Sequence, residues 1–202
     1  MTLIKDKEIT KAKLIEAVGE IIKESGYTGL GVNKIAKRAE VDKCLIYRYF
    51  SGFDGLIEAY VLQRDYWLRT NNNAETFVQR PDEGLKEFVS RLLVEQFDYF
   101  NNSEEMQELI YWEISERNEL LNSISRTREI KAGSLLARID DEVSDNTIDF
   151  RSLSALLVAG IYYLNLHRRV NDSSFCELDI NDPEDRQKLR KTITQLIYHA
   201  LE

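Results

Sequence analysis

Hydrophobic residues recur at intervals of three and four along most of this chain, the spacing of one face of an α-helix. The first such stripe runs from Leu14 to Ile22 and ends before Gly26, a residue type that readily adopts the left-handed conformation after a helix. No segment alternates apolar and polar residues in the manner of a half-buried strand. The pattern predicts an all-α protein of about nine helices.

Residues 26–60 contain two short helical stripes separated by a tight turn. Apolar residues at i, i+3, i+4 and i+7 predict a helix over 32–39, and Glu40-Val41 leaves room only for a turn. Asp42 is a suitable N-cap for the next helix, because its carboxylate can accept backbone N–H groups. In that helix Ile46 and Phe50 face inward, one turn apart. The side chains that are then turned outward together are Lys43, Cys44, Tyr47 and Arg48.

This basic and aromatic face lies on a helix thin enough to enter the major groove of DNA. Arg48 is the side chain best suited to bind guanine through two hydrogen bonds, and Lys43 and Tyr47 are better suited to phosphate. We also expect Lys34, on the preceding helix, to contact the DNA backbone, with a plain solvated lysine as the alternative. The pattern therefore predicts a helix-turn-helix.

Residues 10–60 resemble the DNA-binding domain of the TetR family of bacterial transcriptional repressors. The residues that carry the resemblance are Gly26, Tyr27, Val32, Ile35, Ala36, Ala39, Val41, Ile46, Tyr47, Phe50 and Leu56. The resemblance implies a homodimer that binds double-stranded DNA and responds to a small molecule. The recognition-helix positions that it implies are Lys43, Cys44, Leu45, Tyr47, Arg48 and Tyr49.

Four positions depart from the family pattern. Glu40 stands where a turn glycine is common, and Cys44-Leu45 replaces a Gly-Thr pair whose hydroxyl contacts DNA. Gly31 stands where a Ser or Thr cap is common. Phe53, with Asp54 beside it, replaces a lysine that touches phosphate. We therefore expect modest DNA affinity or an unusual operator.

The charge of the chain divides unevenly. The 202 residues carry a net charge of −8, with +2 on residues 1–69 and −10 on residues 70–202. This asymmetry fits a nucleic-acid-facing N-terminal part on an acidic body, although +2 alone is a weak signal. Two isolated cysteines, the lack of a leader-like N-terminus and the lack of a membrane-length apolar run predict a cytoplasmic protein without membrane contact.

We expect a helix-turn-helix domain at 1–51 and a helical effector-binding and dimerisation domain at 52–202 that begins with a connecting helix at 52–70. A helix at 150–169 is apolar around more than half of its circumference, so it must be buried on two sides. A second copy can cover one side, with helix 184–201 completing a four-helix bundle; the alternative is a central helix of a monomeric core. The expected interface residues are Leu153, Leu157, Gly160, Ile161, Leu164, Ile193, Leu196 and Ile197.

Aromatic residues of the body suit either the lining of an effector pocket or an ordinary helical core. The pocket candidates are Trp67, Phe88, Phe97, Tyr111, Trp112 and Tyr162. His167 and His199 have no partner at metal-ligand spacing, and no hydrolase, phosphate-loop or metalloprotease motif is present. We therefore expect no metal, no cofactor and no enzymatic activity. Cys44 allows a redox switch if its thiolate is favoured by the helix N-terminus and Lys43; otherwise it is simply a small residue.

These observations predict a ligand-responsive, dimeric repressor that binds a palindromic operator and is released by a hydrophobic or aromatic small molecule. One alternative is a helical ligand-binding or scaffold protein of the same fold that has lost sequence-specific DNA binding, an interpretation favoured by Phe53 and Asp54. Another is an α-helical enzyme acting on a hydrophobic substrate, which would require acid–base residues that the sequence does not display.

Overall fold

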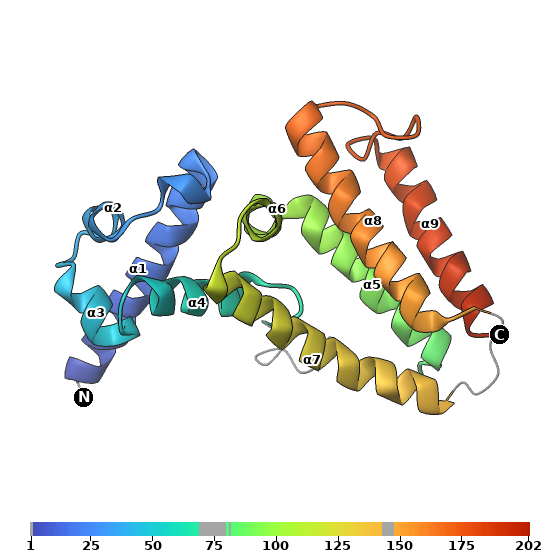
Figure 1. Cartoon of the computed structure of the whole chain (residues 1–202), viewed down its shortest axis with the longest axis horizontal. Helices are drawn as coiled ribbons and strands as arrows, with labels where there is room; N and C mark the ends of the chain where they lie inside the picture. Colours follow the sequence, from blue (N-terminus) through green and yellow to red (C-terminus); the bar gives the residue numbers. More distant parts are fainter. Residues whose placement is uncertain (1, 69–79, 81, 143–147) are drawn as a thin grey trace. The chain divides into compact units, whose positions relative to one another are not determined.

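The structure, a computed structural model, describes residues 2–68, 80, 82–142 and 148–202. Within these residues the chain has nine α-helices, one short 3₁₀ helix and no strand (Figure 1). In chain order the elements are α1 (Thr2–Ser25), η1 (Tyr27–Gly29), α2 (Val32–Arg38), α3 (Cys44–Phe50), α4 (Phe53–Arg64), α5 (Leu85–Asn102), α6 (Glu104–Ser115), α7 (Glu119–Glu142), α8 (Phe150–Asn171) and α9 (Pro183–Ala200). The predicted all-α class is confirmed.

Two helix boundaries follow directly from the residue types at the ends. Gly26 has φ +67° and ends α1, with its N–H donating to the carbonyl of Ile22 at 2.9 Å. At the start of α9 the Asp182 carboxylate accepts the N–H of Glu184 at 2.6 Å, and Pro183 occupies the first turn, where its missing donor costs nothing.

The connecting helix is shorter than the predicted 52–70. α4 ends at Arg64, because Asp65 adopts an extended conformation and its carboxylate accepts the N–H groups of Trp67 at 2.9 Å and Leu68 at 3.1 Å. A side-chain acceptor that captures the next donors in this way competes with continuation of the helix. Residues 69 and 70 of the predicted helix lie outside the described residues.

The chain divides into two compact units. Unit 1 comprises Met1–Arg69 and Glu104–Thr127, and unit 2 comprises Thr70–Ser103 and Arg128–Glu202. The predicted boundary between residues 51 and 52 thus falls inside unit 1, because α4 packs on α1 and α3, and α6 packs on α1, η1 and α4. Unit 1 therefore contains the helix-turn-helix together with α1, α4, α6 and the first part of α7, up to Thr127.

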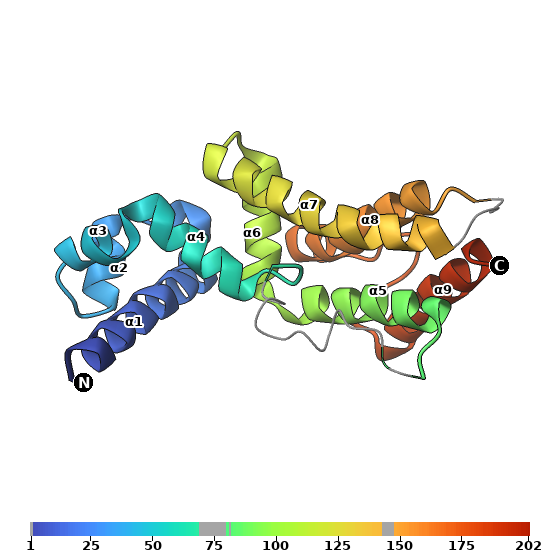
Figure 2. The same cartoon turned by 90° about the horizontal axis from the view of Figure 1, so that it is seen from below.

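The core of unit 1 is formed by the apolar stripes of its helices, of which α2 and α4 lie beside α1 (Figure 2). The fully buried members include Leu14, Val18, Ile21, Ile35, Ile46, Leu56, Ile57, Tyr60 and Val61. Gly55 allows α4 to approach the end of α3 closely, since a β-carbon there would overlap the carbonyl oxygen of Phe50. This contact fixes the C-terminal end of α3 against α4.

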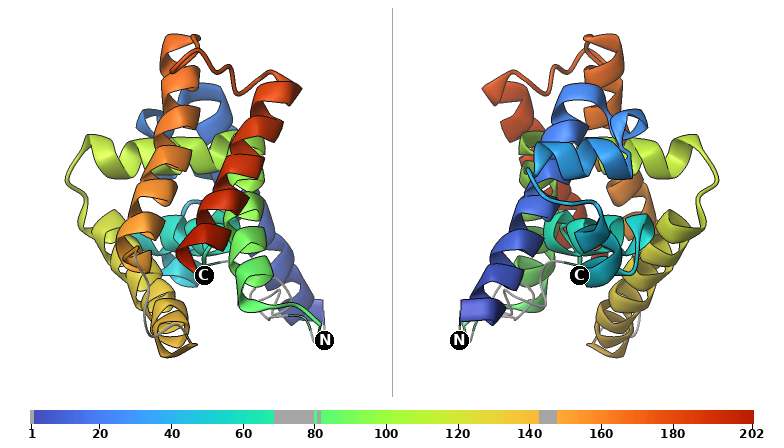
Figure 3. Two further views of the ribbon diagram at one scale, coloured as in Figure 1. Left: turned by 90° about the vertical axis from the view of Figure 1, so that its right-hand side faces the viewer. Right: turned by 90° about the vertical axis from the view of Figure 1, so that its left-hand side faces the viewer.

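In unit 2 the helices α5, α8 and α9 lie side by side (Figure 3). α5 packs more extensively on α9 than on α8. The Asp98 carboxylate on α5 accepts from Nε of Arg190 on α9 at 2.7 Å, an ion pair that accompanies the apolar contact between these two helices. The fully buried rings of Phe88, Phe97 and Phe100 on α5 form the centre of this unit.

Candidate nucleic-acid interface

Local interactions fix both ends of α3. Lys43 takes the N-cap position for which the sequence predicts Asp42. Asp42, one residue earlier, still holds the first turn, because its carboxylate accepts the N–H of Cys44 at 2.7 Å and its carbonyl accepts the N–H of Leu45 at 3.0 Å. Ile46 is completely buried and Phe50 is half-buried against the core of unit 1. The opposite side of α3 is therefore the solvent side.

That solvent side carries the predicted basic and aromatic face. Tyr47 is 58% exposed, and Lys43, Cys44 and Arg48 are also exposed. The Lys43 ammonium lies 3.5 Å from Oδ1 of Asn33 on α2, which adds an amide beside the face. The sequence interpretation missed Asn33, although a polar residue in the first turn of the preceding helix was an available signal. The arrangement offers donors for base edges and phosphates on one short helix.

Tyr49 and Leu45 differ from the exposed candidates because both are half-buried. The Tyr49 ring has two cations near its face, with the Lys7 ammonium and the Arg48 guanidinium each 5.8 Å from the ring centroid. Cations at this distance are attracted by the ring quadrupole. Tyr49 thus orients Arg48 and holds the start of α1 beside α3.

Two of the three basic residues of α2, Lys34 and Arg38, bond to side chains of α1. Nζ of Lys34 lies 3.2 Å from the Ser25 hydroxyl at the end of α1. Arg38 pairs with Glu24 through two hydrogen bonds of 2.5 and 2.7 Å. The hydrogen bond from Arg38 lowers the pKa of Glu24, and the same bond raises the pKa of Arg38. Arg38 therefore fastens α2 to α1.

Cys44 does not have the environment of a reactive thiolate. A hydrogen bond with the Asp42 carboxylate is the largest influence on the thiol and raises its pKa, against a smaller opposite effect of Lys43. A redox switch requires the thiolate form. Asp42 thus opposes the thiolate that Lys43 favours, and the redox switch stays a prediction.

The first turn of α4 is built for packing. Phe53 is half-buried against the core of unit 1, while Asp54 is exposed. An acidic residue stabilises the N-terminal end of a helix, but its charge repels a phosphate group. The start of α4 therefore adds no positive charge beside α3.

A buried carboxylate on α6 fastens that helix to α1 and α4. Glu105 accepts from the Tyr60 hydroxyl at 2.7 Å and pairs with Lys23 at 2.6 Å and with Arg64 at 3.2 Å. Burial opposes ionisation, but the hydrogen bonds from Lys23 and Tyr60 and the charge of Arg64 bring the pKa of Glu105 below its usual value. The carboxylate is therefore charged and shared by three side chains.

A second contact joins α6 to η1, the short helix that precedes α2. The Glu108 carboxylate accepts the N–H of Tyr27 at 2.9 Å. The Tyr27 ring stacks on Trp112, with centroids 5.1 Å apart and planes inclined by 8°. Together, Glu105, Glu108 and Trp112 form what we call the α6 contact. α6 thereby touches the helix-turn-helix at both of its flanks, α4 and η1.

The six aromatic pocket candidates are divided between the two units. Trp67, Tyr111 and Trp112 belong to unit 1, whereas Phe88, Phe97 and Tyr162 belong to unit 2. In unit 1 the indole N–H of Trp112 donates to Glu116 at 2.5 Å, which satisfies that ring. A single pocket lined by all six remains a prediction.

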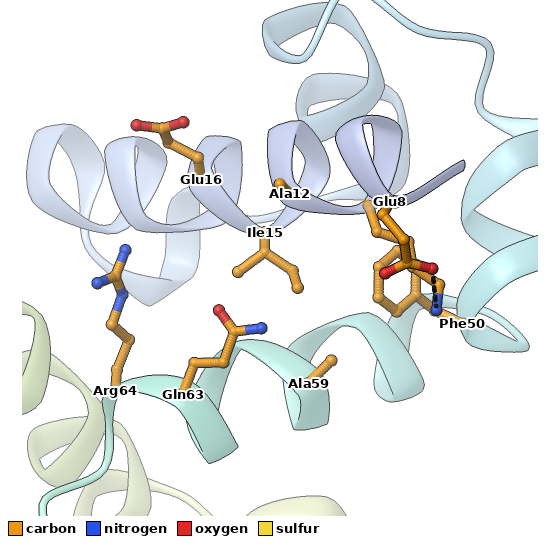
Figure 4. A pocket seen from close by; sticks show the side chains of 9 residues that line it. Glu8, Ala12, Ile15, Glu16, Phe50, Ala59, Gln63 and Arg64 are labelled. Atoms are coloured by element: carbon orange, nitrogen blue, oxygen red, sulfur yellow. Dashed lines mark ion pairs between the residues drawn. The ribbon is translucent and has the colours of Figure 1, made fainter. Parts of the chain in front are cut away.

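A hollow of about 460 Å³ opens between α1 and α4 in unit 1 (Figure 4). Ile15 points into it from α1, and Gln63 and Arg64 extend toward it from α4. Glu8 and Lys11 form an ion pair of 3.4 Å at its edge. Because none of the six aromatic candidates lines this hollow, it is a different place from the predicted effector pocket.

The predicted dimer residues fall into two groups. Ile161, Ile193 and Ile197 are buried within unit 2, so they contribute to the core of one protomer. The half-buried members are Leu153, Leu157, Gly160, Leu164 and Leu196. The most exposed large apolar side chains on α8 are Leu156, at 73%, Val170, at 63%, and Tyr163, at 53%, none of which was among the predicted interface residues.

Within the described residues no helix is both long and apolar enough to cross a membrane. The fold and the α3 face are those of an all-helical protein with a helix-turn-helix. Residues 13–60 match the model of the bacterial regulatory proteins of the tetR family. This match assigns the domain at 13–60 to the TetR family of helix-turn-helix transcriptional regulators.

Named relatives agree with this assignment. The chain is 26% identical over 137 residues to the probable HTH-type transcriptional regulator YttP of Bacillus subtilis, covering 67% of this chain and 65% of that protein. It is 31% identical over 86 residues to the HTH-type transcriptional regulator BetI of Burkholderia thailandensis, covering 42% of this chain and 44% of BetI. The matches thus span less than two thirds of either relative. Both relatives are transcriptional regulators, which is a non-enzyme class.

Solved structures extend the likeness to the whole fold. The transcriptional regulator FadR of Bacillus subtilis, solved with stearoyl-CoA, superimposes with a TM-score of 0.65 at 18% identity, over 95% of this chain and 99% of FadR. A TetR family transcription regulator of Marinobacter aquaeolei superimposes with a TM-score of 0.63 at 17% identity, over 96% of this chain and 97% of that one. At these identities the likeness concerns the fold alone.

Proposed function

We propose that this protein is a homodimeric repressor that binds a palindromic DNA operator through α3 and is released by a small-molecule effector. The observation that carries the proposal is the exposed group of Lys43, Tyr47 and Arg48 on a short helix whose other side is anchored by the buried Ile46. A helix that only covers the surface of the protein does not need to be fixed at both of its ends. A helix that reads DNA does, because base contacts require a fixed register.

Dimerisation is supported by the apolar side chains that α8 leaves in solvent. Leu156 and Tyr163 are one heptad apart and so lie on the same side of the helix. These exposed residues lie beside half-buried ones, such as Leu157 and Gly160. A contiguous apolar surface of this kind is typical of a protein–protein interface. Two copies would present two α3 helices to half-sites roughly 34–36 Å apart, which supplies the contacts that one short helix lacks.

Effector control is supported by the α6 contact. Because Glu105 bonds α1 and α4 while Glu108 bonds η1, a movement of α6 would displace the flanks of the helix-turn-helix. An effector acts only if it binds one arrangement of these helices better than the other. Coupling between two such sites is commonly about 1–3 kcal/mol, sufficient to change operator affinity 5- to 150-fold.

The test is selection of random double-stranded DNA by the full-length protein at low salt, followed by binding measurements at rising salt. We expect a palindrome whose affinity falls about 5- to 150-fold in Arg48→Ala, the equivalent of about 1–3 kcal/mol for a bidentate guanine contact. Lys191→Ala, which removes an exposed positive charge from α9, serves as the control and should leave binding unchanged. Sequence-blind binding that disappears with modest salt would contradict the proposal.

One observation favours a second candidate, a helical ligand-binding or scaffold protein that no longer reads DNA. Asp54 is exposed in the first turn of α4 and Phe53 is turned toward the core, so that the start of α4 opposes phosphate binding. This candidate predicts that the selection yields no palindrome, even at low salt, while small molecules still stabilise the protein.

A further inference from the structure

Unit 2 contains buried amides with unused hydrogen-bonding capacity. Asn165 on α8 is 1% exposed; its Nδ2 donates to the carbonyl of Ile161 at 2.8 Å, and its Oδ1 is buried without a partner among the described residues. Because a backbone carbonyl can only accept, the orientation of this amide is fixed and its free atom is an acceptor. Buried polar atoms without partners are rare in folded proteins, and each calls for a physical explanation.

The second amide faces α8 from α5. Gln96 is 1% exposed, its Nε2 donates to the Tyr162 hydroxyl at 3.3 Å, and its Oε1 is likewise buried without a partner among the described residues. Tyr162 and Asn165 lie one turn apart on α8, so they share a face of that helix. The Phe100 ring on α5 lies 4.8 Å from the Tyr162 ring. Gln96, Phe100 and Tyr162 therefore meet between α5 and α8, and Asn165 lies one helical turn from Tyr162 on the same face of α8.

We infer that these groups are the recognition site for the effector, and that the effector is a neutral aromatic molecule bearing an N–H or O–H donor. The inference rests on the proposed function, since it identifies the ligand class of the same regulator. Asn165 and Gln96 supply acceptors for the donor, and the Phe100 and Tyr162 rings supply an apolar surface. Charged ligands are disfavoured because the polar groups of the site are uncharged and buried.

An apolar side chain of similar size at position 165 distinguishes a ligand site from a structural amide. Asn165→Leu removes the unpaired acceptor, so it should raise the thermal midpoint of the unliganded protein. If the amide instead had a structural role and bound a water, Asn165→Leu would lower the thermal midpoint. The water and the Ile161 carbonyl would then each lose the hydrogen bond that the amide makes with them. Gln96→Leu gives an independent second variant on the facing helix.

The binding probe is benzamide, with N,N-dimethylbenzamide lacking the donor and benzoate carrying a charge. Saturation-transfer NMR on the full-length protein should detect benzamide and neither analogue. In Asn165→Leu and Gln96→Leu the benzamide signal should fall at least tenfold. Ser90→Ala is the matched control: Ser90 is also buried with an unpaired hydroxyl on α5, but it lies about 120° around the helix from Gln96. It should leave the benzamide signal unchanged.

Three results would overturn the inference: a lower thermal midpoint in Asn165→Leu, equal signals from all three probes, or binding of stearoyl-CoA without binding of benzamide. Operator binding measured on the same variants separates this outcome from failure of the proposed function. Asn165→Leu and the parent protein could bind the selected palindrome equally while benzamide binds to neither. That result would support the proposed repressor function and contradict only the inferred ligand class.

Discussion

The two units of this chain differ in how completely their own residues satisfy one another. In unit 1 the buried carboxylate of Glu105 has three partners, and Glu108 and Arg38 are paired across helices. In unit 2 the oxygens of two buried amides have no partner among the described residues, and Leu156 on α8 is 73% exposed. A unit whose buried carboxylates are paired internally is suited to hold a DNA-binding helix in a fixed position. A unit with unmet hydrogen bonds and exposed apolar surface is the one expected to bind partners.

The largest expected effect is on the exposed side of unit 2. Leu156→Glu should convert the dimer into monomers, because a carboxylate buried at an apolar interface costs several kcal/mol. The corresponding increase in the dissociation constant is on the order of a thousandfold. Sedimentation equilibrium across a concentration series measures it directly, and operator affinity should fall with the dimer.

Ile130→Glu is the control for this experiment. Ile130 lies on α7 and is 73% exposed, the same fraction as Leu156. Exposure alone therefore cannot distinguish the two positions, and only Leu156 lies on the proposed interface. A parent protein that is already monomeric at micromolar concentration, or two variants that behave alike, would remove the argument that α8 meets a second copy.

The next prediction tests whether the paired charges inside unit 1 stabilise it. Glu105→Gln should lower the free energy of unfolding by about 1.5–3 kcal/mol, since hydrogen bonds to charged groups fall in that range and Lys23 would lose its buried partner. Urea denaturation followed by circular dichroism gives the value. The neighbouring Glu104 is exposed, so Glu104→Gln should change stability by less than about 0.5 kcal/mol. Equal losses in both variants would show that the buried network contributes nothing specific.

Much of unit 1 could be predicted from the sequence because its features are local. The stripe from Leu14 to Ile22, the stop at Gly26 and the burial of Ile46 depend on residues within a few positions of one another. The outward direction of Tyr47 and Arg48 follows from that burial. Helical periodicity therefore predicted the α3 face, residue by residue.

The parts that escaped prediction depend on contacts distant in the sequence or on competition at one residue. The bond between Tyr27 and Glu108 joins positions 81 residues apart, and no periodicity reports such a pair. In the sequence Asp65 is one polar residue among others inside the predicted connecting helix, yet its side chain ends α4. Gln96 and Asn165 broke apolar stripes, and this signal was present but was not interpreted as a site.

A smaller effect concerns acid stability in unit 2. Two hydrogen-bonded contacts with Arg91 hold the pKa of Glu83 at about 2, below its ordinary value of 4.5. A depressed pKa in the folded state means that the pair stabilises the protein fully above pH 4.5 and that this contribution is lost as the pH falls toward 2. The difference in urea midpoint between the parent and Glu83→Gln should therefore shrink steadily from pH 5 to pH 2. A difference independent of pH would show that the carboxylate charge is not what stabilises the loop before α5.

The smallest effect concerns Glu40 in the turn between α2 and α3, one of two residues of the helix-turn-helix with a left-handed backbone, the other being Ser51 at the end of α3. Glu40 has φ +57°, a left-handed conformation that side chains with a β-carbon adopt at a cost. Glu40→Gly should raise the free energy of unfolding by about 0.5–1 kcal/mol, because glycine removes the strain but loses more chain entropy on folding. Glu40→Ala keeps the β-carbon and should give no gain, which separates backbone strain from loss of charge. If the turn only connects α2 to α3, operator affinity should stay constant in Glu40→Gly. A stabilised variant that binds the operator less well would instead mean that the strained turn sets the angle of α3, and that unit 1 gives up some stability in order to read DNA.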